Sequence, residues 1–253
     1  MKEEILIIIM ENQLIKQVTA YVETNISNFH QSRINKLSEL KLKTVLKKKN
    51  PYLFKAKYYL TAAELVTSIA NAFISSAEET IFGDWLEGLA IFVCDKVYGG
   101  QKSSTIGVDL EFSKDGIRYI IAIKSGPNWG NSSQIAKMRA DFITAKRTLR
   151  TSRSYLNIVS VNGCCYGTDN NPDKGDYFKY CGQEFWSFIS GEDTLYIDII
   201  EPLATKAKER NDEFEKAYAK MLNKFTSEFI KDFCSEDGAI DWVKLVEFNS
   251  GKK

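Results

Sequence analysis

The sequence contains a single histidine, His30, and this scarcity argues against a zinc centre. Common zinc sites take cysteine and histidine ligands at short, regular spacings. The neighbouring Cys164 and Cys165, with Cys181 further along, do not follow such a spacing. The sequence therefore favours buried thiols over a zinc site.

Long hydrophobic runs are also absent. The apolar start, Ile5 to Met10, is six residues long and follows three charged residues. It is too short for the apolar region of a signal peptide or for a membrane span. The five cysteines are an odd number in a chain without a secretion signal, which favours reduced thiols. We therefore expect a cytoplasmic protein with no membrane partner and no disulfide framework.

The formal net charge is only +1, so total charge neither indicates nor excludes a polyanionic partner. The distribution of charge says more. Between Asn28 and Lys57, nine basic residues stand against the single acid Glu39, whereas the region from Glu184 to Glu215 leans acidic. The basic stretch is either a solvated helix face or a surface that contacts phosphates.

The chain has 253 residues, of which 44% are hydrophobic, so it can bury a substantial core. It shows no internal repeat, low-complexity segment or linker. We expect an α/β fold with helical additions at both ends. Residues 1–60 are expected to form a basic helical region packed on a core of residues 61–253, in one structural domain overall.

Helical spacing of apolar residues dominates both ends of the chain. Two helices are predicted before Pro51, and another begins near Thr61. Ser76 and Glu79 have the form of a capping box before a helix that stops at Gly99. Beyond the centre, the pattern predicts a short helix at 185–189, a long one at 197–233 and a last one at 240–246.

The stretch from Ser104 to Gln134 predicts a β-hairpin followed by a loop and a helix. Apolar and polar residues alternate from Ile106 to Phe112 and again from Tyr119 to Lys124, with turn residues at 113–116 between them. Pairing across a four-residue turn places Asp109 opposite Ile120. The side chains that then share one face are Asp109, Glu111, Ala122 and Lys124. This face is either a catalytic cluster or merely solvated.

Polar residues follow the second strand of this hairpin. The segment contains Asn128, Trp129, Asn131, Ser132 and Gln134, and the helix after it carries Lys137 on a basic face. These side chains either contact phosphates and base edges or form a Gly/Asn-rich turn with a helix cap. A buried strand is then predicted from Tyr155 to Cys165, and the long polar loop at 168–179 is a further candidate binding element.

The elements follow the order helix, acidic strand, turn, strand ending in Ile-Lys, helix, strand. This order resembles that of the PD-(D/E)XK nuclease superfamily, and the sequence looks closer still to the PmeII-like type II restriction endonucleases. The segments that carry the resemblance are PYLFKAK, SSAEETIFGDWLEGLAI, GVDLEF, IKSGPNWGNSSQ, NGCCYG and CGQEFWSFISG. The resemblance implies a mixed central sheet flanked by helices. It also implies a Mg²⁺-dependent homodimer that cleaves double-stranded DNA at a specific short palindrome and leaves 5′-phosphate ends.

Carried over by position, the resemblance makes Asp109 the first metal-binding acid and Lys124 the lysine of the active strand. The acid expected two residues before that lysine is absent, because Ala122 stands there. A second carboxylate would come from Glu87, which we rank first, or from Glu111, and the Ile123 carbonyl is a further candidate ligand. Alternatively, Glu87 is an ordinary solvent-exposed residue of its helix.

The alanine at position 122 leaves other functions open. The chain is alternatively a DNA-binding protein with a nuclease fold that cannot cut, whether naturally inert or inactivated by substitution. A third possibility is a nuclease that recognises damaged or branched DNA by its structure.

Overall fold

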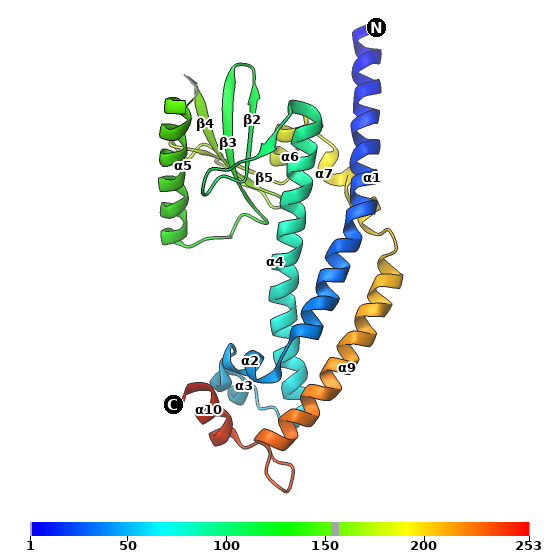
Figure 1. Cartoon of the computed structure of the whole chain (residues 1–253), viewed down its shortest axis with the longest axis vertical. Coiled ribbons are helices and arrows are strands. Elements are labelled where there is room, and N and C mark those ends of the chain that lie inside the picture. The colour runs from blue at the N-terminus through cyan, green and yellow to red at the C-terminus, as the bar shows by residue number, and fades with distance from the viewer. Residues whose placement is uncertain (1, 153–156, 253) are drawn as a thin grey trace. The chain divides into compact units, whose positions relative to one another are not determined.

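The computed structural model describes residues 2–152 and 157–252, shown in Figure 1. The chain divides into two compact units, the first formed by Met1–Ile26 and Phe82–Thr205 and the second by Ser27–Ile81 and Lys206–Lys253. Two long helices, α1 (Lys2–Glu39) and α4 (Ala62–Tyr98), each contribute a segment to both units. The predicted boundary between residues 60 and 61 falls inside the second unit, and that division stays a prediction.

The first unit contains a five-stranded mixed sheet in the order β1-β2-β3-β4-β5. The strands are β1 (Gln101–Lys102), β2 (Leu110–Lys114), β3 (Ile117–Lys124), β4 (Ile158–Cys164) and β5 (Phe178–Cys181). The first three pair antiparallel, and the last three pair parallel. The predicted mixed α/β fold is confirmed. Strands β1 and β5 were not predicted, and the first residues of the predicted strand from Tyr155 lie outside the described residues.

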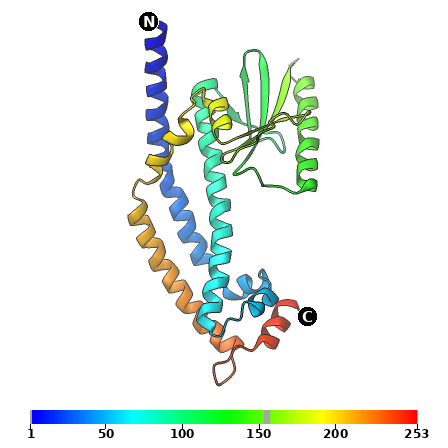
Figure 2. The ribbon, with the colours of Figure 1, turned by 180° about the vertical axis from the view of Figure 1, so that it is seen from behind.

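Helices cover both faces of this sheet (Figure 1 and Figure 2). On one face, α4 and α6 (Gln183–Ser190) join Leu110, Phe112, Ile121 and Ile123 in one apolar cluster. On the other face, α5 (Ser132–Ser152) joins Ile120 and Ala122 in a second cluster. Because successive strand residues point to opposite faces, β3 buries both its odd and its even positions.

The hairpin differs from the prediction at two places, its turn and the start of its first strand. Its turn has two residues, Asp115 and Gly116, with φ of 52° and 75°, values typical of a tight hairpin turn. Glu111, not Asp109, therefore lies opposite Ile120. A shift of two residues leaves every side chain on its predicted face. The strand also begins at Leu110 instead of Ile106, because Gly107 turns the chain with a φ of 77° and leaves Ile106 exposed.

Two helix predictions were also wrong at their ends. No helix starts at Ser76, because α4 is continuous there and Ser76 Oγ donates to the Ala72 carbonyl. The capping box is formed instead by Thr61 and Glu64, each of which accepts a hydrogen bond from the other's backbone N–H. The predicted helix at 197–233 is three helices: α7 (Leu195–Asp198), α8 (Ile200–Leu203) and α9 (Ala207–Phe233). Lys206 interrupts it with a φ of 55°.

The second unit is helical. Beside its segments of α1 and α4 it contains α2 (Leu42–Lys47), α3 (Pro51–Ala56), α9 and α10 (Trp242–Ser250). Helix α9 buries an apolar stripe against them, consisting of Phe214, Met221, Phe225, Phe229 and Phe233. These positions recur at roughly helical intervals, which explains why one face of α9 is buried.

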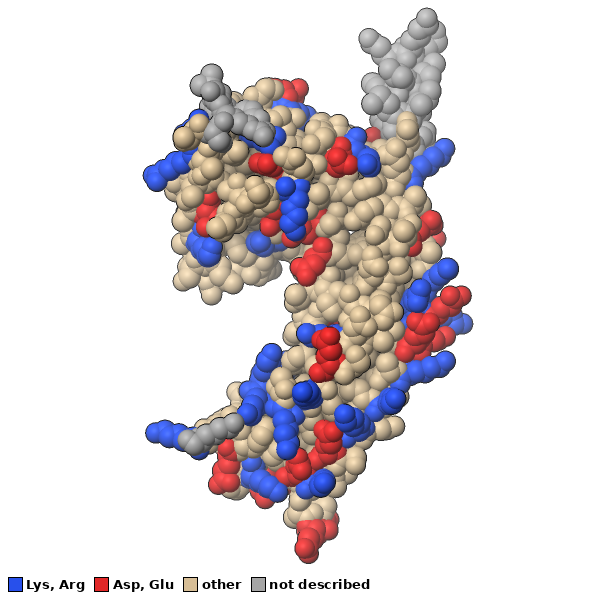
Figure 3. Space-filling model, in the orientation of Figure 1, with Lys and Arg blue, Asp and Glu red and all other residues tan. Residues whose placement is uncertain are grey.

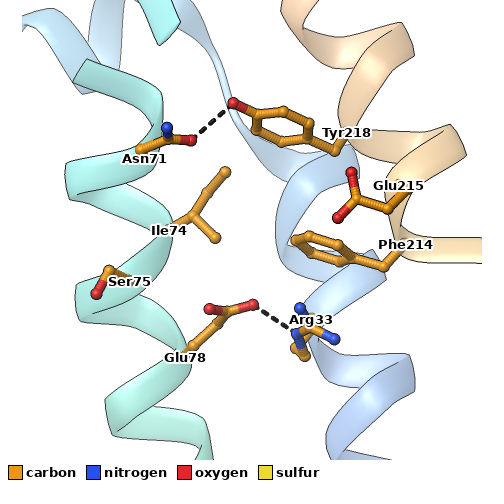
Figure 4. Close-up of a pocket in the computed structure, with 8 residues that line it drawn as sticks. All are labelled: Arg33, Asn71, Ile74, Ser75, Glu78, Phe214, Glu215 and Tyr218. Carbon is orange, nitrogen blue, oxygen red and sulfur yellow. Dashed lines mark hydrogen bonds and ion pairs between the residues drawn. The ribbon is translucent and has the colours of Figure 1, made fainter. Parts of the chain in front are cut away.

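A pocket of about 260 Å³ lies within this second unit (Figure 4). Arg33 forms an ion pair with Glu78 and lies 3.8 Å above the Phe214 ring centroid. The Tyr218 hydroxyl donates to Asn71 Oδ1 at 2.7 Å. These polar side chains thus bond to one another across neighbouring helices. The pocket is therefore explained by the packing of the helices.

The described residues contain no helix with an apolar stretch long enough to cross a bilayer. Cys94, Cys164, Cys165 and Cys181 are buried free thiols, and Cys234 is half-buried. Burial raises the pKa of each of these thiols, with the pKa of Cys94 and Cys165 raised to about 12. They are therefore protonated at neutral pH and poor nucleophiles.

Candidate active site

Asp109 and Lys124 meet where β2 begins and β3 ends. Lys124 Nζ lies 3.9 Å from Asp109 Oδ2, and the two side chains are 32% and 27% exposed. This separation is longer than a hydrogen bond. The ammonium and the carboxylate therefore attract each other but are not in direct hydrogen-bond contact. The sequence prediction that they share a face is confirmed, and solvent reaches both.

The backbone of β3 fixes the Asp109 carboxylate. The Ile123 N–H donates to Asp109 Oδ2 at 2.7 Å, and the Asp109 N–H donates to the Ile121 carbonyl at 2.8 Å. A carboxylate that accepts a backbone hydrogen bond has its orientation set by the sheet instead of by its own rotamers. The orientation of the Asp109 carboxylate is therefore fixed without any bound ligand.

A buried amide organises the other side of Lys124. Trp129 Nε1 donates to Asn162 Oδ1 at 3.0 Å, and Asn162 Nδ2 donates to the Ala122 carbonyl at 3.1 Å. Asn162 is 1% exposed, in the middle of β4. The Lys124 ammonium lies 5.3 Å from the Trp129 ring centroid, within range of a cation–π contact. The hydrogen bonds of Asn162 thus fix the Trp129 ring beside the Lys124 ammonium.

Sequence reasoning assigned Trp129 to DNA contact and did not single out Asn162. The available signal for Asn162 was an amide in the second half of a mostly apolar strand, since a buried amide requires hydrogen-bond partners. Lys179 was also missed; its ammonium donates to the Pro127 carbonyl at 3.0 Å and pairs with Asp169. It thereby ties β5 to the loop that follows Lys124.

The other predicted DNA contacts lie on the exposed surface around the start of α5. Asn131 and Gln134 accept hydrogen bonds from each other's backbone N–H groups, at 3.0 and 3.1 Å, and so cap this helix. Lys137 pairs with Asp141 at 2.8 Å. Asn128 and Ser132 are exposed beside them. The cap role and the DNA role are compatible, because these side chains face solvent.

Glu111 lies in a structural ion pair. Its carboxylate is 3.2 Å from Arg118, and the two side chains are only 12% and 9% exposed. Gln101 Nε2 donates to the same carboxylate at 3.2 Å. Separating a nearly buried pair leaves an uncompensated charge in the protein, which costs several kcal/mol. Glu111 is therefore poorly placed to leave Arg118 for a metal ion.

Glu87 is held much less tightly. Its carboxylate lies 3.3 Å from Lys102, a lysine whose side chain is 71% exposed, while Glu87 itself is 26% exposed. An exposed pair of this kind contributes about 1 kcal/mol or less, so Glu87 can exchange its partner at small cost. Its charge also helps raise the pKa of Cys165, whose N–H donates to the Lys124 carbonyl at 2.9 Å.

These oxygen donors suit a hard cation. Among the described residues, no three His, Cys, Asp or Glu side chains gather closely enough to share an ion. Mg²⁺ does not require such a cage, because it keeps several waters and takes one or two carboxylates. Asp109 offers one such carboxylate, while Glu87 and the Ile123 carbonyl stay predicted ligands.

A mixed sheet with helices on both faces, with an acid and a lysine close together at the ends of paired strands, is consistent with a restriction-endonuclease fold. A family model described as type II restriction endonuclease EcoO109I matches residues 16–211, more than half of the chain. The chain therefore belongs to that family of type II restriction endonucleases. No curated protein matches the sequence. The narrower PmeII-like resemblance stays a prediction.

Proposed function

We propose that this protein is a Mg²⁺-dependent endonuclease that cleaves double-stranded DNA at a specific sequence and leaves 5′-phosphate and 3′-hydroxyl ends. The observation that carries the proposal is the solvent-accessible pair of Asp109 and Lys124, 3.9 Å apart on adjacent strands. Membership in a family of type II restriction endonucleases supports it.

Each residue of the pair has a defined task in this reaction. A Mg²⁺ ion would supply positive charge at the phosphate and make a water more acidic. Asp109, whose carboxylate is fixed by the Ile123 N–H, would hold that ion. Lys124 would orient the attacking water and offset the negative charge that develops on the phosphate. The Trp129 ring limits where the ammonium can move.

We further propose a homodimer. A palindromic DNA site has two-fold symmetry, and a symmetric dimer places one Asp109 and one Lys124 at each strand. Each subunit then cuts one strand.

The second candidate is a DNA-binding protein that cannot cut, and Ala122 is the observation that favours it. Ala122 is 2% exposed and belongs to the apolar cluster beneath α5. A carboxylate introduced there would enter an apolar environment, which is costly unless a cation compensates it.

Incubating plasmid DNA with the unchanged protein and Mg²⁺ separates these two functions. We expect discrete fragments, and we expect Ala122→Glu to destabilise the protein without raising the cleavage rate. Cleavage that appears only in Ala122→Glu would instead indicate that this sequence is an inactivated variant. Fragments that depend on DNA branches or lesions would replace sequence specificity with structure specificity.

Glu87→Gln should raise the Mg²⁺ concentration that gives half-maximal cleavage by about tenfold. Gln keeps the shape of the side chain but loses the charge that attracts the cation. The measurement is a Mg²⁺ titration of the initial cleavage rate.

Glu111→Gln is the matched control for this variant. It should leave the Mg²⁺ dependence unchanged and lower the free energy of unfolding by about 2 kcal/mol, because Arg118 loses its charged partner. An altered Mg²⁺ dependence in Glu111→Gln, with none in Glu87→Gln, would exchange the two assignments.

A further inference from the structure

The second unit carries a surface rich in lysine and free of acids within its own segment. Residues 41–57, which form α2 and α3, contain no acidic residue. We call this segment's basic residues the lysine surface: Lys41, Lys43, Lys47, Lys48, Lys49, Lys55 and Lys57. All are exposed except Lys49, which is half-buried. Figure 3 shows Lys and Arg side chains gathered over this part of the chain.

Aromatic rings, more than carboxylates, hold these ammonium groups. Lys43 pairs with Asp232 at 3.0 Å. Four other members instead lie over rings, at 5.0 to 5.8 Å from the centroids: Lys47 over Phe248, Lys48 over Phe73, Lys55 over Trp242 and Lys57 over Phe54. A ring positions an ammonium without neutralising its charge. The surface therefore stays positive and partly ordered.

Helix α9 of the same unit is a useful contrast. It carries acidic and basic residues in equal number, and four of its five lysines have an acid three or four residues away. Lys208 and Lys216 are each four residues from Asp212, and Lys224 pairs with Glu228 at 3.9 Å. Such pairing is what an ordinary solvated helix face shows. The lysine surface lacks this compensation along its own helices.

A strained tyrosine lies at the edge of the lysine surface. Tyr58 follows α3 with a φ of 59°, a left-handed conformation that glycine adopts at this position without steric cost. Tyr58 is nevertheless 77% exposed, so packing does not explain why a bulky side chain occupies this position. A backbone conformation of this kind, kept at an exposed site, points to a function for the side chain.

We propose that the lysine surface and Tyr58 bind the phosphate backbone of DNA independently of base sequence. This inference rests on the proposed function, since it takes DNA as the ligand. Closely spaced ammonium groups, four of which lie over rings that leave their charge in place, match the regular charges of a duplex. A tyrosine hydroxyl donates readily to a phosphate oxygen. The second unit thus adds a DNA contact that is separate from the residues around Lys124.

The salt dependence of DNA affinity tests this proposal. The full-length variant Lys48→Gln/Lys55→Gln/Lys57→Gln and its control Lys208→Gln/Lys216→Gln/Lys224→Gln remove the same charge. Binding to a short duplex of random sequence is measured in EDTA, where no cleavage occurs. We expect the slope of log affinity against log salt to flatten by up to about 0.9 for each lost contact in the first variant, and far less in the control. Equal changes in both variants, or none, would overturn the proposal.

Tyr58→Gly gives a second, independent readout. Glycine relieves the left-handed strain, so we expect a higher denaturation midpoint together with weaker DNA binding. A variant that is more stable and binds DNA as well as the natural protein would remove Tyr58 from the contact. Loss of binding to phosphatidylserine-containing vesicles, with DNA affinity unchanged, would assign the surface to a membrane instead. Because binding is measured without metal, these results stand whether or not the protein cleaves DNA.

Discussion

Lys124→Ala should lower the rate of DNA cleavage by about a thousandfold. The ammonium lies 3.9 Å from Asp109, the acid that we propose holds the cation. Its loss removes charge stabilisation that acts mainly in the transition state, so the rate should fall while DNA affinity changes little. Single-turnover cleavage and metal-free DNA binding measure the two effects separately.

Lys96→Ala is the matched control for this prediction. Lys96 also pairs with an aspartate, Asp95 at 3.0 Å, and also lies over an aromatic ring, Phe92 at 5.1 Å, but on helix α4. The Lys96→Ala protein should therefore cleave DNA at the same rate as the unchanged protein. An unfolded Lys124→Ala protein would show that this lysine is structural, and an active one would remove it from the site.

Asp109→Asn should abolish measurable cleavage and weaken binding of divalent cations. Asparagine has the same shape, and its carbonyl oxygen can still accept the hydrogen bond from the Ile123 N–H. The fold should therefore persist, while the charge that attracts the cation is lost. Mn²⁺ binding, followed by electron paramagnetic resonance, and circular dichroism measure these two outcomes.

The conservative change makes this experiment decisive. If Asp109→Asn binds Mn²⁺ as tightly as the natural protein, Asp109 is not a ligand and the proposed chemistry fails at its first step. If Mn²⁺ binding is lost but cleavage continues, the ion bound by Asp109 is not the catalytic one.

The hairpin shows how far the sequence could lead. Alternation of apolar and polar residues predicted that Asp109 and Lys124 share a face, and this holds although the pairing differs by two residues. A shift of two preserves the face because the side-chain period in a strand is two. The start of the strand was wrong, because the conformation of Gly107 depends on its packing against Asp141 as well as on local pattern.

Glu111 and Glu87 show where the sequence could not discriminate. Both are acids near the predicted site, and the pattern offered no reason to prefer either strongly. Arg118, seven residues after Glu111, becomes its nearly buried partner only when the hairpin closes. Glu87 keeps a weak, exposed partner in Lys102. The difference in availability thus arises from burial, which local spacing does not report.

The sequence by itself determined the alternation of elements, the face shared by Asp109 and Lys124, and the absence of acids from residues 41–57, because these follow from local periodicity and composition. The tertiary structure alone decided which carboxylate is free to move, that a buried Asn162 links Trp129 to Ala122, and that aromatic rings hold the exposed lysines. These features join residues that are distant in the chain. Their energies depend on burial and on partners that packing brings together.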